Sequence, residues 1–127
     1  MKYFGFTVGF VFLLCVANTH AHEMTPTYPK LETTHVSGVL KTKMKIFNRR
    51  EDVSYYEIGV FDKDWNAIPF VTSYKVLQMD YLAHAEVDIY INEGDATRSE
   101  YICSKSKLRK DDVVSSAIAS RICSRIK

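Results

Sequence analysis

Residues 39–61, VLKTKMKIFNRREDVSYYEIGVF, contain the pattern that decides the fold. From Val39 to Phe47 every second side chain shares a face, and one of the two faces consists of Leu40, Thr42, Met44 and Ile46. A polar turn follows, and Val53 to Phe61 then alternates again with aromatic and β-branched residues. Alternation with a period of two is typical of strands that bury one face. The stretch therefore predicts two β-strands joined by a turn.

The same pattern continues toward the C-terminus. Turn-forming residues occur at Asp62 to Asn66 and at Glu93 to Asp95. Between and after them we expect four further strands, at Ala67–Val71, Val76–Met79, Glu86–Asn92 and Glu100–Lys105. Short strands at a spacing of about 8–12 residues, with turns between them, are typical of an all-β sandwich. No internal repeat or linker divides the chain, so one domain is expected.

Length and charge exclude several classes of protein. The chain has 127 residues, which is too short for a TIM barrel or a two-domain dinucleotide enzyme. Its 17 Lys and Arg residues against 15 Asp and Glu residues leave a net charge of +2. A dedicated nucleic-acid binder would show a more strongly basic surface. The composition therefore indicates a small globular domain.

The N-terminal segment is typical of a secretory signal. Lys2 precedes an almost unbroken apolar stretch from Tyr3 to Ala17, which is shorter than the ~20 residues of a membrane-spanning helix. Thr19 and Ala21 fit the positions that signal peptidase requires. We expect residues 1–21 to be removed, so that the mature domain covers residues 22–127. The alternative is an uncleaved N-terminal anchor.

The cysteines predict one disulfide. Cys15 leaves with the signal, so the exported chain retains Cys103 and Cys123. An even pair in an exported protein indicates a bridge, here closing a loop of about 20 residues and stabilising the fold by roughly 3 kcal/mol. No CxxC motif or histidine cluster accompanies the pair, so a zinc site is not expected.

The C-terminal segment fits two structures. Val114, Ile118, Ile122 and Ile126 recur every four residues, as on one face of a helix. The same segment also alternates isoleucine with serine, as in a strand, at Ile118, Ser120, Ile122, Ser124 and Ile126. Periodicity alone slightly favours the helix.

The order of these features resembles the N-terminal immunoglobulin-like domain of PapD-like periplasmic pilus chaperones. The resemblance covers nearly the whole mature chain and rests on segment order and spacing, at Met24–Leu31, Val39–Asn48, Val53–Asp62, Thr72–Met79, Ala85–Asn92, Glu100–Cys103 and Ala117–Ile122. It implies an immunoglobulin-like β-sandwich in the periplasm, with a last strand at the C-terminus. Some members of the family join their last two strands by a disulfide, where Cys103 and Cys123 would lie. The Arg and Lys with which the family anchors a subunit correspond to positions near Tyr28 and at Cys123 here.

The resemblance also implies a function. The family donates its last strand to a pilus or surface-fibre subunit that lacks one, which supplies backbone hydrogen bonds and fills an apolar groove. The expected partner-binding residues are Val114, Ile118, Ser120, Arg121, Ile122 and Arg125. The alternative for the isoleucines is that they fill the core of this domain itself.

Two other functions remain open, and catalysis is not expected. A small exported structural or adhesive protein would use the same edge to assemble with itself. An N-terminal His22 would allow copper binding, with His35 and His84 as the only other histidine ligands in the mature chain. No nucleophile with a base and no Gly-rich phosphate loop is present, and we expect neither a cofactor nor a resident metal.

Overall fold

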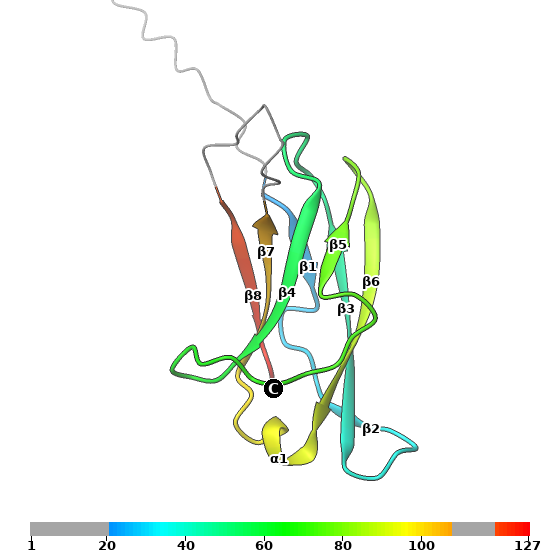
Figure 1. Cartoon of the computed structure of the whole chain (residues 1–127), viewed down its shortest axis with the longest axis vertical. Coiled ribbons are helices and arrows are strands. Elements are labelled where there is room, and N and C mark those ends of the chain that lie inside the picture. The colour runs from blue at the N-terminus through cyan, green and yellow to red at the C-terminus, as the bar shows by residue number, and fades with distance from the viewer. Residues whose placement is uncertain (1–20, 108–118) are drawn as a thin grey trace, which may run out of the picture.

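Two antiparallel sheets pack face to face in the computed structural model, which describes residues 21–107 and 119–127 (Figure 1). In the first sheet, β3 (Val39–Phe47) pairs with β6 (His84–Asn92) along its whole length. The short strands β1 (Glu23–Thr25) and β2 (Glu32–Thr33) pair with β3 as well. The second sheet has the order β5-β4-β7-β8, with bounds Val76–Gln78, Tyr55–Phe61, Tyr101–Lys107 and Arg121–Arg125. The fold is therefore the predicted immunoglobulin-like β-sandwich.

The core lies between the sheets and uses the faces that alternation predicted. In β3 the inward side chains of Met44 and Ile46 are buried, and Tyr56, Ile58 and Val60 of β4 oppose them. The middle of β6 adds three more buried side chains, Val87, Ile89 and Ile91. Burial of one face fixes the strand register, because a slip of one residue would turn every one of these side chains to solvent.

Prolines explain two differences from the predicted strands. Of the expected first strand, Met24–Leu31, only Met24 and Thr25 belong to a strand, β1, and β2 begins after Leu31. Pro26 and Pro29 interrupt the ladder between β1 and β2, because they have no backbone N–H to donate. The expected strand Ala67–Val71 makes only isolated bridges, Ala67 with Phe61 and Val71 with Tyr90. Pro69 lies between these bridges, and the segment crosses from one sheet to the other. The expected turn after β6 is the one-turn helix α1 (Glu93–Ala96).

The ambiguous C-terminal segment forms a strand where the structure describes it. β8 is antiparallel to β7, and the facing pair Cys103 and Cys123 carries the predicted disulfide with a Cα–Cα distance of 4.1 Å. This distance is typical of the close, non-hydrogen-bonded pairs of an antiparallel ladder. Two of the predicted partner-binding residues, Val114 and Ile118, lie outside the described residues.

The predicted signal segment also lies outside the described residues, except for Ala21. Within the part of the chain that is described, no helix has the length and hydropathy needed to cross a membrane.

Candidate functional site at the edge of β8

The outer side of β8 is a partly open sheet edge. Ser120 accepts a hydrogen bond from Ser106 of β7, and Ile126 donates one to Glu100, so the even-numbered backbone groups of this segment face β7. The odd-numbered groups then point away from β7. Within residues 21–107 and 119–127, the outward N–H groups of Arg121 and Cys123 have no hydrogen-bond partner. These two residues form the free edge.

The second half of the same edge is closed by the N-terminal segment. The N–H of Arg125 donates to the carbonyl of Thr27 at 3.0 Å, and the N–H of Lys127 donates to Pro29 at 3.0 Å. The guanidinium of Arg125 pairs with Glu100 at 2.8 Å. Arg125 is thus already bound to this domain by its backbone and by its side chain.

The side chains of β8 divide between the core and the surface. Ile122 and Ile126 are partly buried and pack against the core cluster, and Ser124 between them is buried. Arg121 and Arg125 are exposed on the opposite face. Ile122 therefore contributes to the core of this domain, which was the alternative expected for the isoleucines. Its insertion into a partner stays a prediction.

A buried polar cluster holds the beginning of β8. The ring of His22 is 1% exposed and lies between two serines, with Nδ1 3.1 Å from the Ser120 hydroxyl and Nε2 2.8 Å from the Ser104 hydroxyl. Arg50 approaches the same Ser120 hydroxyl at 3.4 Å and forms an ion pair with Asp52. Ser120, one of the expected partner-binding residues, is thus the residue through which the cluster contacts the edge.

Burial sets the ionisation of this cluster. Loss of solvation lowers the pKa of the His22 imidazole, the hydrogen bond with the Ser104 backbone raises it, and the charge of Arg50 lowers it again; the net pKa is lowered. Burial also raises the pKa of the neighbouring Tyr56 hydroxyl to about 12. His22 is therefore held as the neutral ring, which donates from one nitrogen and accepts at the other.

We expect acid to destabilise the protein through His22. Below the ordinary histidine pKa of about 6.5, the unfolded chain binds a proton that folded His22 does not, so stability falls until the pH reaches the lower folded-state pKa. Urea unfolding at about pH 7.5 and about pH 5 measures this loss, and the His22→Gln variant should lose less over the same interval. Equal losses in the two proteins would contradict the assignment.

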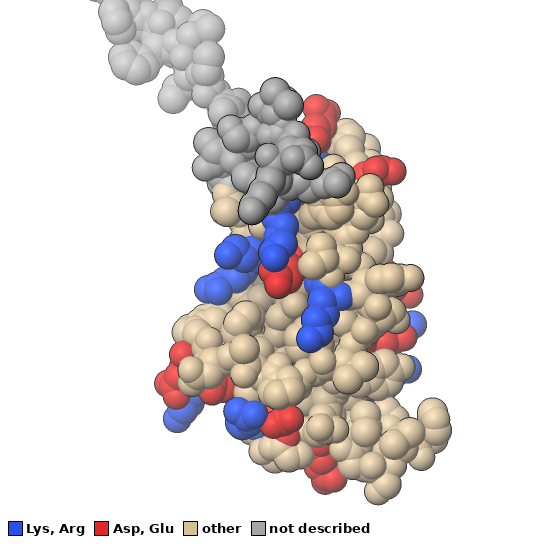
Figure 2. All heavy atoms as spheres, in the orientation of Figure 1, with Lys and Arg blue, Asp and Glu red and all other residues tan. Residues whose placement is uncertain are grey.

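The outer face beside the free edge is basic. The ladder places Glu57, Lys105 and Arg121 in one row across β4, β7 and β8. Lys107 pairs with Glu57 at 2.8 Å, whereas no ion pair of Lys105 or Arg121 occurs within the described ranges. Figure 2 shows Lys and Arg side chains gathered over this part of the surface around an acidic one. All three residues of the row line a hollow of about 310 Å³, together with Gly59 and Cys103.

Trp65 folds over the same face, a contact that the sequence did not predict. Its ring stacks on Tyr101 with centroids 4.4 Å apart, and the guanidinium of Arg121 lies 4.7 Å from the centre of its ring. Trp65 has a φ of 66°, which is uncommon for a bulky residue and turns the ring back toward the sheet. The sequence placed Trp65 in a turn, where half-packing on the sheet is the commoner outcome, but it identified neither Tyr101 nor Arg121 as its contact.

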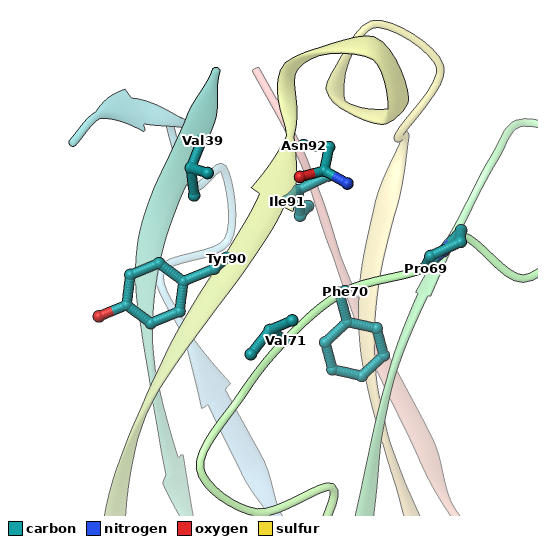
Figure 3. A pocket seen from close by; sticks show the side chains of 7 residues that line it. All are labelled: Val39, Pro69, Phe70, Val71, Tyr90, Ile91 and Asn92. Carbon is teal, nitrogen blue, oxygen red and sulfur yellow. The ribbon is translucent and has the colours of Figure 1, made fainter. Parts of the chain in front are cut away.

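A second hollow lies away from β8 and is mainly apolar. It measures about 320 Å³ and lies where the segment after β4 crosses to β6 (Figure 3). Val71 and Tyr90 hold that segment by two backbone hydrogen bonds of 2.9 Å. Its lining contains no charged side chain, as the full set shows: Val39, Pro69, Phe70, Val71, Tyr90, Ile91 and Asn92. This hollow therefore offers no charged group to a ligand.

The histidine geometry does not favour the copper alternative. Both ring nitrogens of His22 are in contact with serines, and His84 stacks on Phe47 with centroids 4.2 Å apart. No group of three or more His, Cys, Asp or Glu side chains able to hold a metal ion occurs within the ranges that the structure describes.

Comparisons with known proteins show the fold. No family model matches the sequence, and no curated protein matches it either. Among solved structures the chain is similar to the E. coli chaperone DraB, with a TM-score of 0.59 and 14% sequence identity. The alignment covers 84% of this chain and 53% of DraB, so this chain spans about half the length of that protein.

Proposed function

We propose that this protein is an exported, periplasmic chaperone-like protein that binds pilus or surface-fibre subunits by adding a strand at the edge of β8. The observation that carries the proposal is the open backbone of Arg121 and Cys123 at the end of the second sheet. An extended segment that pairs with an open edge gains main-chain hydrogen bonds, and alternate side chains determine its specificity. The likeness to a chaperone fold supports the same function.

Contacts within the domain hold the β8 edge in a fixed conformation, which supports its use for binding. The disulfide joins β8 to β7, and His22 forms a hydrogen bond with the Ser120 hydroxyl from the core side of β8. Both contacts restrain the backbone of the edge. A rigid edge binds with a smaller loss of conformational entropy than a flexible segment. The alternative is assembly of this protein with itself through the same edge. Co-purification distinguishes the two, because self-assembly would yield a polymer of this chain and no second polypeptide.

Proline at position 121 tests the proposal. The N–H of Arg121 points away from β7, so the Arg121→Pro variant keeps the ladder of the domain but cannot donate to an added strand. We expect the full-length protein, expressed in its own host, to co-purify with one dominant polypeptide and the variant to capture about tenfold less of it. The Arg121→Gln variant removes the same charge and keeps the N–H, so it controls for the loss of the guanidinium.

The Ile122→Pro variant provides the matched control for the backbone. Its N–H faces β7, so this change should destabilise the domain itself, as circular dichroism would show. Capture that persists unchanged in a folded Arg121→Pro protein would place the partner surface elsewhere. A polymer of this chain alone, lost in the same variant, would establish self-assembly in place of chaperone binding.

A further inference from the structure

Two cations beside the free edge form no ion pair among the described residues. Lys105 and Arg121 lie next to each other on β7 and β8 and have no ion-pair partner within the described ranges. The neighbouring cations are neutralised, since Lys107 pairs with Glu57 and Arg125 pairs with Glu100. Among the described residues, the first half of the β8 edge therefore carries more positive than negative charge, with Glu57 as the carboxylate of the row, whereas the cation of the second half is paired.

The sheet geometry determines what an added strand places beside this charge. Directly opposed side chains of adjacent strands lie on the same face, about 4.5–5.5 Å apart at their Cβ atoms. A residue opposite Arg121 would therefore have its side chain on the outer face, beside the guanidinium and the hollow that Lys105 and Arg121 border. The next residue of that strand would face inward, on the side of Ile122.

We infer that the segment bound by β8 is an extended strand with an acidic residue opposite Arg121 and apolar residues on its inward face. The inference rests on the proposed function and specifies the chemistry of the partner. A carboxylate there pairs with Arg121 and gains from the positive charge of Lys105, while a basic residue would meet both cations. The guanidinium is already oriented by its contact with Trp65, so little side-chain entropy is lost when the pair forms.

Three synthetic peptides test the inference directly. Each is a fluorescein-labelled peptide about nine residues long in which valine alternates with Glu, Gln or Lys. Fluorescence anisotropy with the full chain should show that the Glu peptide binds about threefold more tightly than the Gln peptide and about tenfold more tightly than the Lys peptide. The preference should weaken from about 0.05 M to about 0.5 M salt, because exposed charges are screened.

Two substitutions assign the preference to one side chain. Arg121→Gln should reduce the preference for Glu, and Arg121→Glu should reverse it toward the Lys peptide. Lys43→Gln changes the net charge equally but lies on β3 of the other sheet, where Lys43 pairs with Glu86, so the preference should persist. This control separates a local effect from attraction by the whole molecule.

The possible failures are distinguishable. If the three peptides bind equally, or if Arg121→Gln retains the full preference for Glu, the inferred acidic partner is wrong while strand addition stands. If none of the peptides binds, strand addition at β8 is contradicted, and the inference is contradicted with it. Arg121→Pro should lose all three peptides, which shows that any binding observed uses the backbone of the edge.

Discussion

Replacing Asn48 with alanine is expected to lower the free energy of unfolding by about 3 kcal/mol, the range found when a buried hydrogen-bond network is broken. The Asn48 side chain is completely buried where β3 ends. Its amide nitrogen donates to three backbone carbonyls and its oxygen accepts two hydrogen bonds; the partners are Val53, Met79, Asp80, the Arg50 N–H and the Tyr56 hydroxyl. Alanine would remove a buried partner from the Tyr56 hydroxyl and from the carbonyls of Val53 and Met79.

Urea unfolding measures this effect, and Asn66→Ala is the matched control. Asn66 also donates from its side chain, at 3.1 Å to Asp62, but the bond is exposed, so water replaces it at little cost. The free energy of unfolding should change by less than about 1 kcal/mol in the control. Similar losses in the two variants would show that Asn48 does not organise the turn.

Removing the disulfide should have an effect of similar size. Cys103 and Cys123 are 20 residues apart, and in the chain-entropy model a bridge of this span stabilises the native state by about 3 kcal/mol. The double variant Cys103→Ala with Cys123→Ala should therefore unfold at a correspondingly lower urea concentration. Wild-type protein treated with a reductant should lose a similar amount, which separates loss of the bridge from changes in packing. Two free thiols in untreated protein would contradict the prediction.

Local alternation was sufficient to predict the central strands. Met44 and Ile46 lie in the core together with Val87 and Ile89, because a strand with one buried face must repeat every two residues. For the last segment periodicity slightly favoured a helix, because the spacing of Ile122 and Ile126 satisfies helix and strand alike. Pairing with β7 decides in favour of the strand, and pairing depends on residues far away in the sequence.

The candidate site was only partly accessible from the sequence. Arg121 was predicted as a partner-binding residue, but Lys105 and Trp65 were not linked to it. The β7–β8 register brings Lys105 beside Arg121, and Trp65 reaches it from the turn after β4. His22 was considered for its position at a new N-terminus. Its contacts with Ser104 and Ser120 span 82 and 98 residues, a distance at which no local pattern carries information.

The contact of Thr27 and Pro29 with the second half of β8 has a consequence for alignment. A strand that pairs with Arg121 and Cys123 cannot slide toward the C-terminus, because Thr27 already accepts the hydrogen bond of Arg125. Pro29 has no N–H to extend the ladder further on that side. An added strand would therefore end at this contact and could lengthen only toward Ser120. The backbone of this domain, and not the side chains of the partner, would then fix one end of the register of the added strand.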